Sequence, residues 1–275
     1  MTYSNGIPLQ RGSAGPARPP RPDDLSVGLV MQGVLLVALS AGAGLGAAGW
    51  AAGATFGLAT WALLMAGLQR TGRSGLGPAD RVTLARTVLV GGVAALAVES
   101  LTRPVPATGV VALTVTALLL DGVDGQVARR TGTSSGFGAR FDMEVDAFLI
   151  LVLGLLLVRP LGGWVLALGG MRYAFVVAGW ALPWLRAALP QRFSRKVVAA
   201  VQGVVLVVAV AGVLPAGVTL AAVLVALASL CWSFGRDVVW LARRRAVPTV
   251  GAACAAEAPG YVRSEPATPR EPVTT

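Results

Sequence analysis

Between Leu118 and Val158 the chain reads "LLLDGVDGQVARRTGTSSGFGARFDMEVDAFLILVLGLLLV", a polar segment with an apolar run on either side. This stretch holds five of the thirteen acidic residues of the chain, which are Asp121, Asp124, Asp142, Glu144 and Asp146. Carboxylates within or beside membrane-spanning segments are energetically costly, so they mark functional sites by default. We therefore expect a site built from carboxylates at the edge of a membrane.

The composition of the whole chain is that of a membrane protein. Of its 275 residues, 55% are hydrophobic and 13% are charged, whereas about 25% of the residues in a soluble domain are charged. Apolar runs of about 20 residues, the length of a helix that crosses a bilayer, recur along the chain. The polar–apolar alternation of a membrane β-barrel is missing. These features predict an all-α fold, a polytopic membrane helix bundle.

Two residue types limit the chemistry. The chain contains no histidine, which excludes a histidine general base and any catalytic triad built on one. The two cysteines, Cys231 and Cys254, lack the spacing of a metal site. We therefore expect neither a disulfide nor a zinc site.

Eight apolar segments are predicted between two tails. The tails, residues 1–24 and 246–275, are rich in Pro and small or polar residues and are expected to be disordered. Residues 25–70 form two transmembrane helices and residues 78–241 form six more. The predicted segments are 27–46, 50–68, 82–99, 107–124, 142–158, 162–185, 197–213 and 216–240.

Charge placement predicts how the chain is oriented. The net charge is +10, and the basic residues cluster beside apolar runs. With a cytoplasmic N-terminus, the inner side carries eighteen Lys and Arg residues and the outer connections only Arg103 and Arg159. This asymmetry follows the positive-inside rule. We expect a protein of the cell membrane with the Asp-rich stretch and both tails in the cytoplasm. We expect no nucleic-acid partner.

The spacing of the carboxylates places them on two helix faces. One face, with spacing i, i+3, i+4, i+7, is Asp121, Asp124, Gly125 and Ala128. The other, with spacing i, i+4, i+8, is Gly138, Asp142 and Asp146. A short Gly/Ser/Thr loop joins the two helices, and short connections favour antiparallel neighbours. Four Asp side chains are therefore expected to converge.

Four ionised carboxylates in one pocket repel one another unless a cation lies between them. One or two hard divalent cations, Mg²⁺ or Mn²⁺, prefer such oxygen ligands, and two of them match the charge of four Asp. An acidic loop that is simply solvated is the alternative. The spacing does not fit an EF-hand loop, in which Asp residues alternate.

The run from Asp121 to Asp146 resembles the signature of the CDP-alcohol phosphotransferases. All eight signature positions are present with the family spacing: Asp121, Asp124, Gly125, Ala128, Arg129, Gly138, Asp142 and Asp146. The resemblance covers about residues 78–241. It implies a six-helix family core preceded by two extra transmembrane helices.

The resemblance also implies a reaction. A CDP-linked lipid, usually CDP-diacylglycerol, would give its phosphatidyl group to an alcohol acceptor, and CMP would leave. Asp121, Asp124, Asp142 and Asp146 would hold two divalent ions, and Asp146 would also accept the proton of the acceptor hydroxyl. The nucleotide and diphosphate would be bound by Gly125, Ala128, Arg129 and Gly138. Membrane lipids and a homodimer partner are also expected.

Two further runs resemble family elements. "ADRVTLAR", residues 79–86, is similar to a Pro-Asn-x-x-Thr-x-x-Arg run at Thr83 and Arg86. Topology alone would also explain Arg86. "RKVVAAVQG", residues 195–203, resembles a Gly-Lys-x-Lys-Thr-x-x-Gln run of phosphatidylglycerophosphate synthases only at Lys196 and Gln202.

Four basic residues have no anion assigned by this scheme, and they suggest an acceptor that carries one. They are Arg172, Arg192, Arg195 and Lys196. Arginine binds phosphate through two hydrogen bonds at once, which predicts a phosphorylated polyol as acceptor. Topology and lipid headgroups would also explain these residues. Two other functions stay open: a cation-binding membrane transporter that uses the Asp cluster, and an inactive membrane scaffold.

Overall fold

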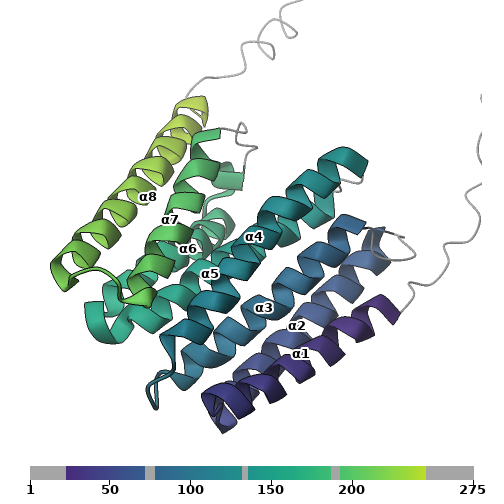
Figure 1. The fold of residues 1–275 in the computed structure, drawn as a ribbon. Helices are drawn as coiled ribbons and strands as arrows, with labels where there is room; N and C mark the ends of the chain where they lie inside the picture. The colour runs from purple at the N-terminus through teal and green to yellow at the C-terminus, as the bar shows by residue number, and fades with distance from the viewer. Residues whose placement is uncertain (1–22, 72–77, 132–135, 187–192, 246–275) are drawn as a thin grey trace, which may run out of the picture.

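A computed structural model describes residues 23–71, 78–131, 136–186 and 193–245, and these form eight α-helices and two 3₁₀ helices without a strand. The elements in chain order are α1 (Asp23–Ala43), α2 (Ala47–Thr71), α3 (Pro78–Glu99), α4 (Ala107–Thr131), α5 (Gly136–Leu161), η1 (Gly163–Leu166), α6 (Ala167–Ala181), η2 (Pro183–Arg186), α7 (Phe193–Ala211) and α8 (Ala216–Arg245). The helices lie side by side in one bundle (Figure 1). The predicted all-α fold is confirmed.

Helix length and hydropathy fit a membrane bundle. Within the described ranges, five helices are long and apolar enough to cross a membrane: α1, α2, α3, the η1–α6 segment and α8. Helices α4 and α7 contain shorter apolar stretches, Ala107–Gly122 and Val197–Ala211. Two α-helices thus precede six, which matches the predicted number of helices, although α5 is not among the candidate spans of the described residues. The expected tails lie outside the described residues, except that α1 already begins at Asp23.

The largest differences from the predicted segments are at the end of α4, at the start of α5 and within 162–185; helix α4 continues to Thr131 rather than ending near 124. The segment predicted at 162–185 is broken into η1, α6 and η2. Gly162 adopts a φ of 96° before the first break, and Pro183 begins the element after the second. Proline has no amide hydrogen to continue a helix. Helix α5 begins at Gly136 rather than near 142, because hydropathy detects only its apolar part and misses the carboxylate-bearing turns.

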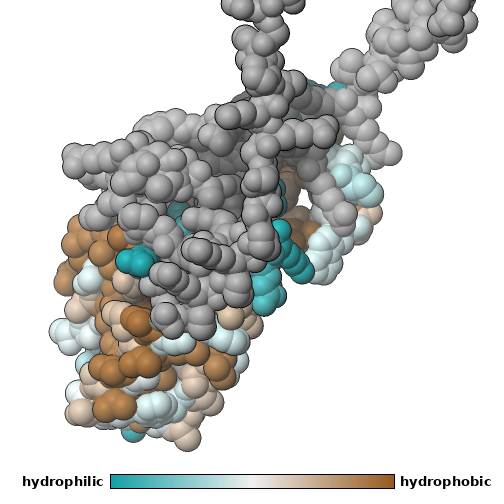
Figure 2. Space-filling model, turned by 90° about the vertical axis from the view of Figure 1, so that its right-hand side faces the viewer, coloured by the Kyte–Doolittle hydropathy of each residue, from teal (hydrophilic) through white to brown (hydrophobic). Residues whose placement is uncertain are grey.

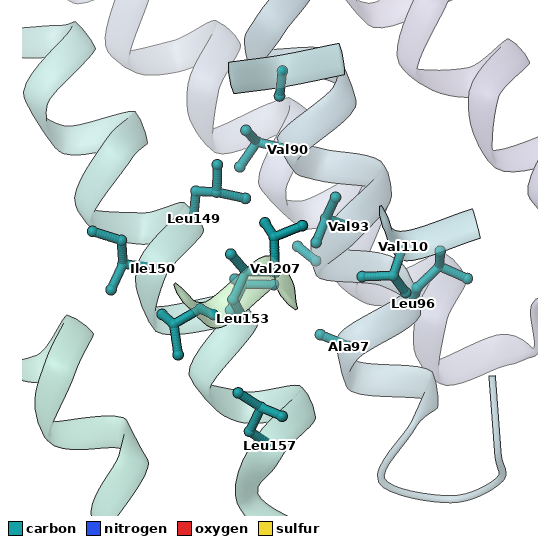
Figure 3. Packing of buried hydrophobic residues seen from close by; sticks show 14 of the residues in the cluster. Val90, Val93, Leu96, Ala97, Val110, Leu149, Ile150, Leu153, Leu157 and Val207 are labelled. Atoms are coloured by element: carbon teal, nitrogen blue, oxygen red, sulfur yellow. The ribbon is translucent and has the colours of Figure 1, made fainter. Parts of the chain in front are cut away.

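Helix α3 is the centre of the bundle. Its span is 67% buried, against 17% for that of α1, and it packs against α1, α2, α4 and α5. Every residue from Val90 to Ala97 is buried. This run, "VGGVAALA", is made of small side chains, which let neighbouring helices approach closely where lipid gives no hydrophobic drive for association. Figure 3 shows Val90, Val93, Leu96 and Ala97 facing residues of α4, α5 and α7.

Helices α5 and α6 also meet at a glycine. A Cβ atom at Gly169 would lie 2.3 Å from the Cα atom of Leu151 on α5. Any side chain there would push the two backbones apart. The short helix α6 is therefore held directly against the helix that carries Asp142 and Asp146.

The first two helices are fixed to α3 at the end of the bundle far from the carboxylates. The Glu99 side chain is only 3% exposed and accepts hydrogen bonds from the amides of Gly46 and Gly49, each at 3.0 Å. These amides lie at the start of α2, where free backbone N–H groups favour an anion. Arg103 pairs with Glu99 and also donates to the carbonyl of Gly44. The α1–α2 pair is thus packed onto the core.

The outer surface of the described part is largely apolar. On the face in Figure 2, apolar residues cover much of the lower part, and strongly hydrophilic residues lie mainly toward the other end. Along α1, large exposed side chains recur every three or four residues: Val27, Val30, Met31, Val34 and Val37. Such a continuous apolar stripe suits contact with lipid tails.

Candidate active site

The carboxylates of α4 and α5 converge on one arginine of α3. The Arg86 side chain is only 1% exposed. Its guanidinium forms ion pairs with Asp121 and Asp142, and its Nη1 atom lies 3.5 Å from Oδ1 of Asp146. The three Asp side chains are between 32% and 41% exposed, so they reach solvent on the side away from Arg86. The site has a buried cationic floor and an open acidic rim.

Helical geometry explains why these groups share one side. Helix α5 is continuous through Asp142 and Asp146, which are four residues apart and therefore stacked on successive turns. Helix α4 is continuous through Asp121 and Asp124, which are three residues apart. The predicted helix faces are confirmed by these backbones.

The loop expected to bring α4 and α5 together lies outside the described residues. In the described residues, α3 and α7 each pack against both α4 and α5. Helix α3 thus places Arg86 against the carboxylates of both helices.

The donor set fits a hard divalent cation. One oxygen from each of Asp121, Asp142 and Asp146 lies within 4.8 Å of the others. Two oxygens on opposite sides of one Mg²⁺ are about 4 Å apart, because each lies about 2.1 Å from the ion. Small side-chain adjustments would therefore suffice. The three carboxylates and Arg86 together carry a charge of −2, which one divalent ion balances.

Several predicted site residues can be placed only in part. Helix α4 extends through Asp124, Gly125, Ala128 and Arg129, but their side chains lie outside the described part. Arg192 lies outside the described residues, and α7 includes the backbones of Arg195 and Lys196 without their side chains. Gly138 lies one turn before Asp142 on α5. Thr83 is buried one turn before Arg86 on α3, and its carbonyl accepts a hydrogen bond from Thr87 Oγ1 at 2.7 Å.

Arg172, one of the four basic residues proposed to bind an anionic acceptor, is paired with an acidic residue of the protein. Arg172 on α6 donates to both carboxylate oxygens of Glu144 on α5, at 2.5 and 3.3 Å. Glu144 is two residues from both Asp142 and Asp146, so at 3.6 residues per turn it lies on the opposite side of α5. Arg172 therefore has an anion within the protein, and the charge balance no longer assigns it to an acceptor. The fifth carboxylate of the stretch belongs to a helix–helix ion pair.

Sequence reasoning underestimated two residues. Arg86 matched a family run, but topology explained it equally well, and only the position of α3 shows its acidic partners. Gln202 on α7 is 2% exposed, and in the described part its Nε2 atom has no hydrogen-bond partner. A buried amide without a partner is costly. The signal for both was a polar residue inside an apolar helix.

A model of one protein family matches the chain. Its description is CDP-alcohol phosphatidyltransferase, and it covers residues 77–233, more than half of the chain. The matched segment begins just before α3 and ends within α8, so α1 and α2 precede it. No curated protein and no solved structure matches this sequence. With the Asp signature on α4 and α5 and the matched segment around it, the chain belongs to the CDP-alcohol phosphatidyltransferase family.

Proposed function

We propose that this protein transfers the phosphatidyl group of CDP-diacylglycerol to an alcohol acceptor that carries an anionic group, such as a phosphorylated polyol. The observation that carries this proposal is the convergence of Asp121, Asp142 and Asp146 around the buried Arg86. An acidic rim over a fixed cation suits a ligand that brings a divalent ion and a diphosphate together. Membership of the family supports the same reaction class.

The reaction uses the residues of the chain in separate roles. The hydroxyl oxygen of the acceptor attacks the phosphorus that bears the diacylglycerol group, the bond from that phosphorus to the CMP oxygen breaks, and CMP leaves. Asp146 accepts the hydroxyl proton, because its carboxylate is at the solvent-facing rim and the chain has no histidine. Arg86 holds Asp121 and Asp142 in place. The nucleotide and diphosphate bind near Gly125, Ala128, Arg129 and Gly138.

We propose two divalent ions, Mg²⁺ or Mn²⁺, held by Asp121, Asp124, Asp142 and Asp146. Bound there, they would offset the diphosphate charge and polarise the phosphoryl oxygens. The charge count supports at least one ion for the described groups. With Asp124 the set carries a charge of −3, so one ion leaves −1, and a second ion would be balanced together with the diphosphate of the substrate.

The acceptor proposal now rests on the start of α7. Arg192, Arg195 and Lys196 remain as its candidate anion-binding residues, whereas Arg172 is already paired with Glu144. The buried amide of Gln202 lies two turns further along α7, which packs against α4 and α5. A polar ligand between these helices would give that amide a partner.

We expect Arg195→Ala to raise the KM for the acceptor at least about tenfold, since a charge-assisted contact contributes about 1.5–3 kcal/mol. The KM for CDP-diacylglycerol should change less than twofold. Steady-state kinetics with each substrate varied in turn will measure both. Arg243→Ala, at an exposed position near the end of α8, is the matched control. Equal changes in the two KM values would contradict a role in acceptor binding and leave membrane topology as the explanation for Arg195.

The reaction itself is tested by CMP release. Purified protein receives CDP-diacylglycerol, Mn²⁺ or Mg²⁺ and a panel of acceptors that includes glycerol 3-phosphate, inositol phosphate, free inositol and serine. CMP release that requires both metal and one phosphorylated acceptor supports the proposal. Metal binding without CMP release from any acceptor would favour a cation transporter. Absence of both metal binding and CMP release would favour an inactive scaffold.

We propose that the carboxylate end of the bundle and both tails face the cytoplasm, and that the protein lies in the cell membrane as a homodimer. The first residue of α1 and the last residues of α8 lie at the same end of the bundle (Figure 1). Single cysteines introduced into each tail should be labelled by an impermeant maleimide only after cells are opened. The native cysteines are first replaced by serine. Labelling of either tail in intact cells would contradict this orientation.

A further inference from the structure

Helix α2 lies outside the family-matched segment, yet it contacts the helix that carries Asp142 and Asp146. Phe56 on α2 stacks on Phe148 of α5, with ring centroids 4.8 Å apart and an interplanar angle of 20°. Nearer the carboxylate end, Phe141 of α5 packs against the buried cluster that Leu64 and Leu68 form on α2. These two leucines are 4% and 1% exposed. Helix α2 therefore touches α5 at two levels.

The two contacts have matching spacings along α2 and α5, and along α5 they lie before and after the turns that carry Asp142 and Asp146. Phe56 and Leu64 are eight residues apart, about 12 Å along α2, and Phe141 and Phe148 are seven residues apart, about 10.5 Å along α5. Phe141 immediately precedes Asp142, and Phe148 follows Asp146 by two residues. The seven-residue spacing puts both phenylalanines on one side of α5, about 130° from the side that bears the two aspartates. Rotation of α5 would break these contacts and move the carboxylates together.

Helix α3 contains a gap that lets α2 approach α5. A Cβ atom at Gly91 would lie 2.8 Å from Cδ1 of Phe56 and 2.6 Å from Oε1 of Gln32. The missing side chain leaves space beside α3 for the Phe56 ring. Leu84 of α3 joins the second contact, beside Leu64 and Phe141. The route from α2 to α5 is thus built from three helices.

We infer that α2 positions the metal-binding carboxylates, and that Phe56, Leu64 and Leu68 are positioning residues for the site. They act through Phe148 and Phe141, which fix the rotation and the height of α5 against α3. Arg86 can contact Asp142 and Asp146 only when α5 has this rotation about its axis and this height relative to α3. The catalytic part of the inference rests on the function proposed above. The structural part, that α2 supports α5 through these contacts (the α2 buttress), is argued from packing alone.

The test compares Phe56→Ala with Leu58→Ala, whose side chain is on the same helix and 59% exposed. Hydrogen exchange of the α5 amides from Asp142 to Ile150 should rise at least fivefold in Phe56→Ala and stay unchanged in Leu58→Ala. The Kd for Mn²⁺, measured by electron paramagnetic resonance, should rise about tenfold, as for other residues that orient metal ligands. The kcat for CMP release should fall about tenfold while the KM for CDP-diacylglycerol stays within twofold.

Phe56→Leu keeps an apolar side chain without the ring and should recover part of the Mn²⁺ affinity. Gly91→Ala should reproduce the exchange and affinity changes from the α3 side, without removing Phe56. If Phe56→Ala and Gly91→Ala show the same hydrogen exchange and the same Mn²⁺ affinity as Leu58→Ala, the inference is overturned. If exchange rises in Phe56→Ala but the wild-type protein neither binds Mn²⁺ nor releases CMP, the buttress stands and the proposed function fails.

Discussion

Asp142→Asn and Asp146→Asn are each expected to reduce CMP release at least about 1,000-fold, because the loss of metal-based stabilisation is worth several kcal/mol and each 1.36 kcal/mol is a factor of ten. Asparagine keeps the size of the side chain but removes the negative charge that a divalent ion and Arg86 both face. At Asp146 the change also removes the group proposed to accept the hydroxyl proton. CMP release is measured in purified protein under saturating CDP-diacylglycerol, acceptor and Mn²⁺.

Glu144→Gln is the matched control for these two variants. Glu144 is on the same helix and two residues from either aspartate, but it pairs with Arg172 on the other side of α5. Its substitution should leave CMP release within about threefold, since an exposed ion pair contributes at most about 1 kcal/mol to stability. All three variants should elute as folded protein in detergent. Near-full activity of Asp142→Asn or Asp146→Asn would contradict the site assignment.

Arg86→Gln is expected to have the second largest effect. It removes the one described cation that contacts three carboxylates, and the misplaced Asp side chains should lower kcat/KM about 100-fold. The free energy of unfolding should fall by about 2 kcal/mol, less than the 3–5 kcal/mol of a fully buried pair, because the carboxylates are partly hydrated. Arg86→Lys keeps the charge but loses the planar guanidinium that can donate to two carboxylates at once, so it should recover only part of the activity.

The decisive measurement for Arg86 is the thermal midpoint with and without metal. In Arg86→Gln the three carboxylates lack their internal cation, so Mn²⁺ should raise the midpoint more than it does in the wild type. The loss of stability should therefore be largest in EDTA. Arg70→Gln, at an exposed position near the end of α2, is the control and should match the wild type in both buffers. Equal stabilisation of wild type and Arg86→Gln by Mn²⁺ would show that Arg86 and the ion do not face the same ligands.

Much of this protein could be predicted from the sequence, because the relevant physics is local. Apolar runs of about 20 residues have to form helices in a membrane, since lipid offers no partner for backbone N–H and C=O groups. The spacing of Asp121 with Asp124, and of Asp142 with Asp146, fixes which residues share a helix face. The helix count therefore followed from the apolar runs, and the two carboxylate faces followed from the helical spacing of the aspartates.

The helix ends were predicted less well where polarity and backbone chemistry compete. The carboxylates of α5 lower the local hydropathy, so the helix was expected to begin near 142 although it begins at Gly136. In the segment predicted at 162–185, uniform hydropathy concealed two breaks. Pro183 was the local signal for the second break, and Gly162, with its positive φ, marks the end of α5 just before η1.

Which helices meet could be seen only in the folded protein, because interhelical contacts join residues far apart in sequence. Arg86 is 35 residues from Asp121 and 56 from Asp142, and no periodicity reports that distance in space. The same holds for Glu144 with Arg172, and for Phe56 with Phe148. The pairings of Arg86 and of Phe56 depend on α3 being buried between its neighbours, and that burial depends on the small side chains from Val90 to Ala97, whereas the Glu144–Arg172 pair depends on the packing of α5 against α6. Residue spacing along the chain sets the two carboxylate faces, and the packing around α3 brings Arg86 to the aspartates and α2 against α5.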